Sequence, residues 1–339
     1  MPLPPAGTSG GDNGGVPIAT TSRPRVLVTR SGCPGAGVER LALTCEVVDT
    51  GTSSPSSPGR LRELARGATA ILGIAGDRID AGLLDAAGAG LRVVALASAG
   101  FDQIDLAAAR ERGVVVTHTP NVLEETTADL AFALVLMSRR RLWEAGESLR
   151  GGRWTGFVMD AYLGLDVHGA TLGILGYGQI GRAVARRGRG FGMTVVHHSR
   201  TAGSDEVSRA VDLETLLRES DVVSVHVPLT DQTRHLVGAR ELALMKPTAT
   251  LVNTARGPVV DQEALVAALR AGRLHSAGLD VYDREPLGSD LAGLMDVPGL
   301  VLLPHVGSAT LATRSAMVDL AVDNVLAVVA GGAALTPVP

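Results

Sequence analysis

Residues 171–190 read TLGILGYGQIGRAVARRGRG, and this stretch decides the fold. A β-branched apolar run at 171–175 leads directly into Gly176, Gly178 and Gly181, which open a segment rich in Ala, Val and Arg. The first glycine permits a tight turn, the second lets backbone approach a pyrophosphate, and the third lets the helix pack against the strand. The pattern predicts a dinucleotide site at a helix N-terminus. The alternative is a glycine-rich turn that serves packing alone.

Similar strand patterns occur on both sides of this stretch. Short β-branched runs alternate with longer Ala/Leu/Arg segments, which is typical of parallel sheets covered by helices. In the first third of the chain the runs are Val26–Thr29, Ala70–Ile74, Val93–Ser98 and Val114–Thr117. Beyond it they are Thr171–Leu175, Thr194–His198, Val222–Val227, Thr250–Asn253, Ala277–Leu279 and Val301–Leu303. We therefore predict an α/β fold with two Rossmann-like, doubly wound parallel-sheet domains.

The order of these runs also predicts how the chain is divided. Residues 122–308 supply a complete doubly wound unit and are expected to form the NAD(P)-binding domain. Residues 23–121 lack a closing element, which the last helix can supply, so 23–121 plus 309–339 would form a discontinuous substrate domain. One long helix is predicted over Val122–Arg141, because acids lie in its first turns and three arginines at its end. We expect the active site in the cleft between the domains.

The composition of the 339 residues excludes several classes of function. The 31 basic and 35 acidic residues give a formal charge of −4 without a large block of one sign, so neither nucleic acid nor a membrane is an expected partner. Cys33 and Cys45 are too few for a disulfide framework, and no apolar run reaches the ~18 residues of a membrane span. We expect a cytoplasmic protein with a disordered tail at residues 1–22, which are rich in Pro, Gly, Ser and Thr.

The end of the second strand of the dinucleotide unit decides between NAD and NADP. An NAD site usually has an Asp or Glu there, which accepts a hydrogen bond from the ribose 2′-hydroxyl. Here the strand is followed by Ser199, Arg200 and Thr201. No carboxylate repels a 2′-phosphate, and a guanidinium with two hydroxyls can bind one. We expect NADP(H), with NAD(H) as the alternative if Arg200 only stacks on adenine or faces solvent.

Three residues can carry the reduction of a 2-oxo acid. That chemistry needs a cation for the carboxylate and a proton donor that works near neutral pH. Arg256 and His305 each follow a predicted strand, at the sheet edge where ligands of open α/β folds bind. Glu285 precedes a proline in GLDVYDREP, and a carboxylate bonded to an imidazole would orient it and favour its protonated form. The other histidines show neither HExxH spacing nor a Cys pair, so no metal site is predicted.

Seven segments resemble the D-isomer-specific 2-hydroxyacid dehydrogenases, in particular their glyoxylate and hydroxypyruvate reductases, over about residues 25–330. In chain order they are ASAGFDQIDLAAARERGVVVTHTP, VLEETTADLAFALVLMSRR, TLGILGYGQIGRAVARR, HVPLTDQTRHLVG, LVNTARGPVVDQEALVAAL, GLDVYDREP and LPHVGSATLATR. The resemblance implies NAD(P)H-dependent reduction of a small 2-oxo acid to the D-2-hydroxy acid, and the reverse oxidation. It also implies that Arg256 anchors the substrate, while Glu285 pairs with the proton donor His305.

The resemblance further implies which residues touch the substrate and the cofactor. Ser98, Ala99 and Gly100 would offer backbone N–H groups to the substrate carboxylate, unless they form only a strand-to-loop turn. The cofactor would contact Gly176, Tyr177, Gly178, Gln179, Ile180, Gly181, Ser199, Arg200, Thr201, Val227, Pro228, Thr233, Thr254, Ala255, Arg256, Asp280, His305 and Gly307. Family members are commonly homodimers, with the helix that matches Val122–Arg141 at the interface.

Two other functions are compatible with the same motifs. A dinucleotide-sensing transcriptional corepressor would retain the Arg, Glu and His without needing turnover. A dehydrogenase for another small acid, such as phosphoglycerate, a phosphonate or a branched 2-oxo acid, would differ in pocket walls that the sequence does not specify. Formate dehydrogenases carry Gln where this chain has Glu285, and the SRT at 199–201 resembles the glyoxylate reductases.

Overall fold

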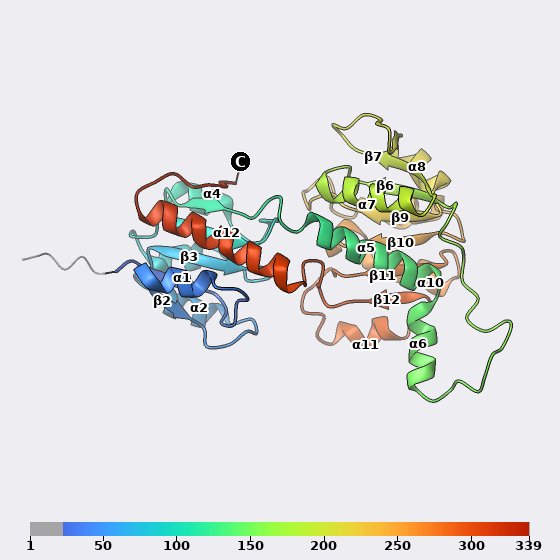
Figure 1. The fold of residues 1–339 in the computed structure, drawn as a ribbon, viewed down its shortest axis with the longest axis horizontal. Helices are drawn as coiled ribbons and strands as arrows, with labels where there is room; N and C mark the ends of the chain where they lie inside the picture. Colours follow the sequence, from blue (N-terminus) through green and yellow to red (C-terminus); the bar gives the residue numbers. More distant parts are fainter. Residues whose placement is uncertain (1–22, 339) are drawn as a thin grey trace, which may run out of the picture.

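The computed structural model describes residues 23–338, which form two β-sheets covered by helices (Figure 1). The strand pairs of both sheets are parallel, so the predicted α/β class with two parallel sheets is confirmed. The tail predicted at residues 1–22 lies outside the described residues. Between residues 23 and 338, no helix has the length and apolarity to cross a membrane.

The first sheet has the strand order β2-β1-β3-β4-β5. Its strands are β1 (Arg25–Val28), β2 (Glu46–Asp49), β3 (Ala70–Ile74), β4 (Val93–Ala97) and β5 (Val115–Thr117). The predicted strands correspond to β1, β3, β4 and β5, whereas β2 was not predicted because its sequence EVVD is a half-exposed edge with only two apolar residues. The winding reverses between β1 and β3, so the crevice at their carboxyl ends is a switch point where ligands of such sheets bind.

Five helices cover the first sheet. They are α1 (Gly37–Thr44), α2 (Pro58–Ala65), α3 (Ala81–Ala87), α4 (Leu106–Glu111) and α12 (Leu311–Val329). Asp80, Asp105 and Thr310 cap α3, α4 and α12 by accepting hydrogen bonds from backbone N–H groups in the first turn. The C-terminal helix α12 packs on β3, β4 and α1, so the end of the chain returns to the sheet built by its beginning (Figure 1).

The second sheet has the order β12-β11-β10-β9-β6-β7-β8. Its strands are β6 (Thr171–Leu175), β7 (Thr194–His198), β8 (Arg209–Ala210), β9 (Val222–Val225), β10 (Thr250–Asn253), β11 (Ser276–Leu279) and β12 (Leu300–Leu302). All were predicted except the two-residue edge strand β8, which is too short to give a pattern. The winding reverses between β6 and β9, so the glycine turn after β6 lies at the switch point of this sheet.

The helices of the second sheet show one departure from prediction. They are α5 (Glu124–Arg139), α6 (Leu142–Arg150), α7 (Gln179–Gly190), α8 (Leu213–Glu219), α9 (Ala239–Leu244), α10 (Gln262–Arg270) and α11 (Asp290–Met295), with a 3₁₀ turn η1 (Gly257–Val259). The long helix was predicted to reach Arg141, but α5 ends at Arg139 because Arg141 has a left-handed φ of 53° and a separate helix follows. The Arg139 side chain is buried and donates to carbonyl oxygens of Asp166, Asp221 and Thr248.

Candidate active site between the two sheets

The glycine turn after β6 has the geometry that a bound pyrophosphate needs. Gly176 has a φ of 97°, and a Cβ there would lie 2.7 Å from the backbone of His226. A Cβ at Gly181 would lie 2.1 Å from the carbonyl oxygen of Gly176, so helix α7 can approach the strand only without a side chain there. At Gly178 no atom lies within 4 Å of such a Cβ, which leaves the outer face of the turn open to a ligand at the N-terminus of α7.

The two polar side chains in this turn are engaged elsewhere. Tyr177 is buried, its ring stacks on His197 with centroids 3.8 Å apart, and its hydroxyl donates to Asp205. Burial and the Asp205 carboxylate raise the pKa of Tyr177 to about 12. The Gln179 side chain donates to the side chain of Asn121. Residues 177 and 179 therefore present mainly their backbone to the open face of the turn.

Residues 199–201, directly after β7, include a cation and no carboxylate. The Ser199 hydroxyl accepts from the N–H of Ala202 at 3.3 Å, which shapes the turn, while Arg200 and Thr201 are exposed. The nearest acid along the chain, Asp205, accepts from the Arg182 guanidinium at 2.8 Å, from Tyr177 and from backbone N–H groups. The charge of Asp205 is thus compensated within the protein, and Arg200 is left without an ion-pair partner among the described residues.

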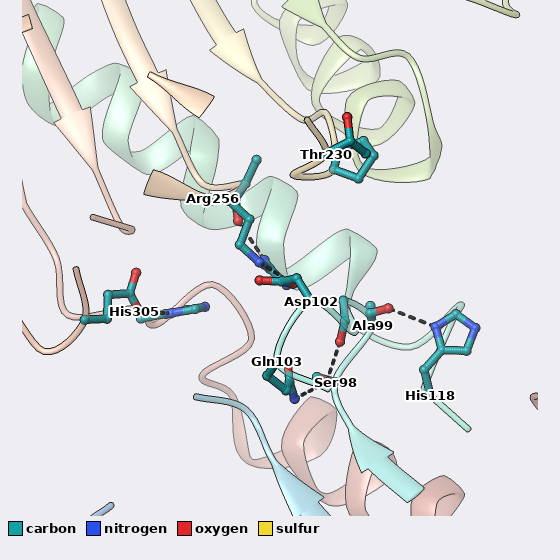
Figure 2. A network of polar contacts seen from close by, with 12 residues as sticks. Ser98, Ala99, Asp102, Gln103, His118, Thr230, Arg256 and His305 are labelled. Atoms are coloured by element: carbon teal, nitrogen blue, oxygen red, sulfur yellow. Dashed lines mark hydrogen bonds and ion pairs between the residues drawn. The ribbon is translucent and has the colours of Figure 1, made fainter. Parts of the chain in front are cut away.

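Arg256 reaches across to the first sheet. It follows β10, where the Asn253 side chain accepts from the N–H of Ala255 and donates to the Arg256 carbonyl, and these bonds fix the loop. The Arg256 Nε donates to Asp102 Oδ1 at 2.9 Å (Figure 2). A Cβ on Gly100 would lie 1.8 Å from Arg256 Nη2, so the guanidinium can occupy this position only beside a glycine. The predicted Arg256 and Ser98–Gly100 loop are thus brought together.

A hydrogen-bond network holds the Ser98–Gly100 loop in shape. The Ser98 hydroxyl donates to the carbonyl oxygen of Gly100 at 2.7 Å and accepts from the Gln103 side-chain amide at 3.1 Å. The Ala99 carbonyl oxygen lies 2.8 Å from the Nδ1 atom of His118, whose ring also packs edge-on against Phe101. The carbonyl oxygens of Ala99 and Gly100 are therefore both engaged in contacts within the protein. These contacts orient the peptide units beside Arg256.

His305 and Glu285 form the predicted pair. His305 follows β12 with a left-handed φ of 53°, and its Nδ1 lies 2.6 Å from Glu285 Oε2. The other oxygen of Glu285 accepts from the N–H of Tyr282 at 3.0 Å. Burial raises the pKa of Glu285, but hydrogen bonds from His305 and Tyr282 and the charges of His305 and Arg256 outweigh it and leave the pKa below its usual value. The carboxylate is therefore ionised beside the imidazole.

Asp280 supports the backbone on the other side of His305. Its buried carboxylate accepts from the N–H groups of Val306 and Gly307 at 2.7 and 2.8 Å. Burial raises the pKa of Asp280. Both oxygens are thus engaged in holding the strained residue at 305 in place, a task that the sequence does not reveal. Figure 2 shows the resulting orientation, in which the His305 imidazole points toward Asp102 and Arg256.

The remaining predicted cofactor residues lie in loops at the same edge of the second sheet. The Val227 side chain lies beside Gly176, and the Thr233 hydroxyl donates to the Pro228 carbonyl at 2.6 Å, which curves the loop after β9. The Thr254 hydroxyl is buried without a hydrogen-bond partner among the described residues. An unpaired buried hydroxyl next to Arg256 is suited to a polar ligand.

Sequence reasoning missed several residues of this site. Asp102, Gln103 and His118 hold Arg256 or the Ser98–Gly100 loop, yet none had been given a role. Asp102 lies in the segment FDQID, directly after the Ser-Ala-Gly run, and an acid beside a substrate-binding loop was the only available clue. Within residues 23–338 no group of His, Cys, Asp or Glu is arranged to hold a metal ion.

Comparison with known proteins assigns the chain to a family. Residues 132–307 match the D-isomer specific 2-hydroxyacid dehydrogenase, NAD binding domain. The chain is 41% identical over 317 residues to a glyoxylate reductase of Thermococcus litoralis, a match that covers 91% of this chain and 95% of that protein. It is 45% identical over 299 residues to glyoxylate/hydroxypyruvate reductase B of Erwinia tasmaniensis, with 86% and 92% covered.

A solved structure gives the same result in three dimensions. An NADPH-dependent glyoxylate/hydroxypyruvate reductase from Sinorhizobium meliloti, in complex with NADP and malonate, superimposes with a TM-score of 0.81 at 37% identity. The superposition covers 94% of this chain and 97% of that one. The glycine turn, the placement of Arg256 and the pairing of His305 with Glu285 thus occur in a chain that matches such enzymes along most of its length. The chain belongs to the D-isomer-specific 2-hydroxyacid dehydrogenase family.

Proposed function

We propose that this enzyme reduces glyoxylate or hydroxypyruvate to the D-2-hydroxy acid with NADPH, and catalyses the reverse oxidation. The observation that carries the proposal is the imidazole of His305, bonded to the ionised Glu285 and pointing toward Arg256. The relatives named above act on these substrates according to their names. Residues 23–121 with 309–339 serve as the substrate domain and residues 122–308 as the dinucleotide domain, in a cytoplasmic protein.

The residues around the cleft have separate tasks in this reaction. Arg256 and the backbone N–H groups of Ser98–Gly100 bind the substrate carboxylate, which places the carbonyl oxygen at the free Nε2 edge of His305. NADPH, held by the dinucleotide domain, would supply the hydride that C2 of the 2-oxo acid needs. His305 donates the Nε2 proton to the carbonyl oxygen, and Glu285 keeps the imidazole oriented and stabilises its protonated form.

The cofactor contacts come from loops at the carboxyl edge of the second sheet. The open face at Gly178 would hold the pyrophosphate, and the segment 199–201 would hold the 2′-phosphate of the adenosine ribose. The loop after β9 and the buried hydroxyl of Thr254 would supply further contacts to the cofactor. Titration with NADPH measures binding to these residues separately from turnover.

The function itself is tested by a matrix of substrates and cofactors. Glyoxylate, hydroxypyruvate, pyruvate and a branched 2-oxo acid are each mixed with NADPH and with NADH, and the loss of nicotinamide absorbance is followed. We expect turnover of glyoxylate or hydroxypyruvate, with the higher kcat/KM for NADPH. Tight binding of the dinucleotide with no turnover of any 2-oxo acid would contradict the proposal and favour a dinucleotide-sensing corepressor.

Arg200 is expected to set the preference for NADPH. Arg200→Ala should raise the KM for NADPH about tenfold, because a charge-assisted contact to the 2′-phosphate is worth about 1.5 kcal/mol. The KM for NADH should change little. Arg218→Ala, which removes another exposed arginine, on α8, is the control. An equal rise of KM for both cofactors in Arg200→Ala would assign Arg200 to adenine stacking instead.

The homodimer is proposed to form through an arm that extends from the second sheet. Helix α6 and residues 151–165 lie outside the body of that sheet (Figure 1). Several large apolar side chains of the arm are exposed: Trp143, Leu149, Trp154, Phe157, Met159 and Leu163. Apolar clusters of this kind mark surfaces that bind a partner, and a second copy of the chain joined next to α5 is the occupant we propose.

Disrupting this arm should change the oligomeric state. Phe157 and Met159 are 84% and 79% exposed, so replacing both with serine leaves the core of the chain untouched. We expect the wild type to elute as a dimer and F157S/M159S as a monomer in size-exclusion chromatography with light scattering. Leu43→Ser, on α1 of the first sheet, removes an equally exposed side chain and should keep the dimer. A monomeric wild type at tens of micromolar would refute the proposal.

A further inference from the structure

A cavity of about 800 Å³ begins at His305 and runs along the carboxyl ends of β1 and β3. His305, Glu285 and Ala97 line it at the catalytic end, and Arg30, Cys33 and Arg314 lie elsewhere in its wall. Its location coincides with the switch point of the first sheet, where ligands of open α/β sheets bind. Glyoxylate has only five non-hydrogen atoms, and at ~30 Å³ for a water-sized group it would fill only a small part of this volume.

The orientation of the substrate decides what enters the cavity. Arg256 and the Ser98–Gly100 loop are absent from its described wall, whereas His305 belongs to it. A 2-oxo acid whose carboxylate lies on Arg256 and whose carbonyl oxygen faces His305 therefore directs its remaining carbon chain away from Arg256. Because His305 borders the cavity, a longer carbon chain has this volume open to it.

The wall of the cavity carries more positive than negative charge. Its one carboxylate, Glu285, is already bonded to His305. Arg314 forms no ion pair or side-chain hydrogen bond with any residue in the range 23–338, and its side chain is exposed at the start of α12. Burial, followed by the charges of the nearby Asp49 and Glu39 carboxylates, raises the pKa of the Cys33 thiol, which favours its neutral form. An anion in the cavity would meet no uncompensated carboxylate of the described wall.

Arg30 is held rigidly in the same wall. Its Nε and Nη2 donate to Asp77 at 2.9 to 3.2 Å, and the buried Asp77 also accepts from the Thr29 hydroxyl at 2.7 Å. Nη1 has no hydrogen-bond partner among the described residues, so one donor edge of the fork is available. A guanidinium whose rotamer is already fixed loses little entropy when it binds an anion. Asp77 offsets its charge, which leaves Arg314 as the uncompensated cation.

We propose that this wall is a second anion subsite of the active site, with Arg314 as its charged anchor and Arg30 as its fixed donor. The inference rests on the proposed reduction of 2-oxo acids and extends the substrate class beyond glyoxylate and hydroxypyruvate. The site takes 2-oxo acids of four or more chain atoms that end in a second anionic group, either a carboxylate or a phosphate. Arg314 selects among substrates and takes no part in the chemical step.

The test compares substrates that differ only in terminal charge. Oxaloacetate, 2-oxoglutarate and 3-phosphohydroxypyruvate provide the anionic arm, and 2-oxobutyrate and 2-oxopentanoate provide uncharged chains of similar length. With wild-type enzyme and NADPH we expect kcat/KM at least tenfold higher for the best anionic substrate than for its uncharged counterpart. The arm with the higher value identifies carboxylate or phosphate as the ligand. A ratio near one would overturn the proposal.

A matched pair of variants assigns the selectivity to its residue. Arg314→Gln should reduce the ratio of anionic to uncharged kcat/KM by at least tenfold. Arg40→Gln, on α1, removes the same charge from an exposed arginine that pairs with Asp319 of α12, the helix that carries Arg314. This variant should leave the ratio unchanged. Equal losses for both substrate classes in Arg314→Gln would refute the subsite. Turnover of glyoxylate by the wild type distinguishes failure of the subsite from failure of the proposed function. If the wild type does not reduce glyoxylate, the proposed function is refuted and not the subsite alone.

Discussion

Replacing His305 with glutamine is expected to lower kcat for 2-oxo acid reduction by roughly a thousandfold, within the range that a positioned acid contributes. Glutamine has a similar size and can still hydrogen-bond, but it cannot deliver a proton. The expectation follows from the bond between Nδ1 and Glu285 Oε2, which leaves Nε2 as the only ring nitrogen free to face a substrate. Stopped-flow or steady-state rates at saturating NADPH measure the loss.

Two controls separate this chemical role from a structural one. NADPH binding, followed by fluorescence titration, should weaken far less than kcat falls in His305→Gln, because the glycine turn lies after a different strand. Glu285→Gln should reduce kcat by a smaller factor, since the imidazole remains and only its partner changes. His168→Gln, at an exposed position, should have no effect. A kcat within threefold of wild type for His305→Gln would remove His305 from the mechanism.

Continuous burial marks the strands that the sequence predicts most clearly. β3, β4, β9 and β10 consist of nearly uninterrupted apolar or β-branched residues, because both faces of a parallel sheet are covered. β2 and β8 were not predicted, because β2 has only two apolar residues between acids and β8 is only two residues long. The edge strands β5 and β12 were predicted because each contains adjacent apolar residues. The end of α5 was missed for a different reason. Its break depends on the left-handed backbone of Arg141, a residue with no preference for that conformation.

The candidate site shows the same division between local and long-range information. Arg256, Glu285 and His305 could be predicted because each follows a strand whose carboxyl end must face the crevice. The contact between Asp102 and Arg256 joins residues 154 positions apart on different sheets, and only the folded chain brings them together. Tyr177 illustrates the reverse case. Its position in the glycine turn suggests a cofactor contact, but its ring is stacked on His197 inside the protein.

Arg256→Ala is expected to reduce kcat/KM for the 2-oxo acid more than a hundredfold. This corresponds to a loss of roughly 3 to 5 kcal/mol of transition-state stabilisation. The loss should appear mainly in KM, because the guanidinium is proposed to hold the substrate carboxylate in both ground state and transition state. Its place against Gly100 also means that truncation opens space beside the Ser98–Gly100 loop. Arg256→Lys should recover only part of the loss, since a lysine keeps the charge but lacks the planar fork.

Substitution of Asp102, the ion-pair partner of Arg256, should have a smaller effect on the same constants. Asp102→Asn removes the charge opposite Arg256 Nε but keeps its shape, and the pair is partly exposed, with side chains 28% and 39% accessible. An exposed pair of this kind contributes at most about 1 kcal/mol, so KM should rise about fivefold with kcat little changed.

In the double variant D102N/R256A the two losses should not add, because Asp102 acts through Arg256. Arg112→Ala, which breaks a surface ion pair with Asp85, should leave both constants unchanged. Additive losses would show that Asp102 acts independently of Arg256, and an unchanged KM in Arg256→Ala would remove the guanidinium from substrate binding.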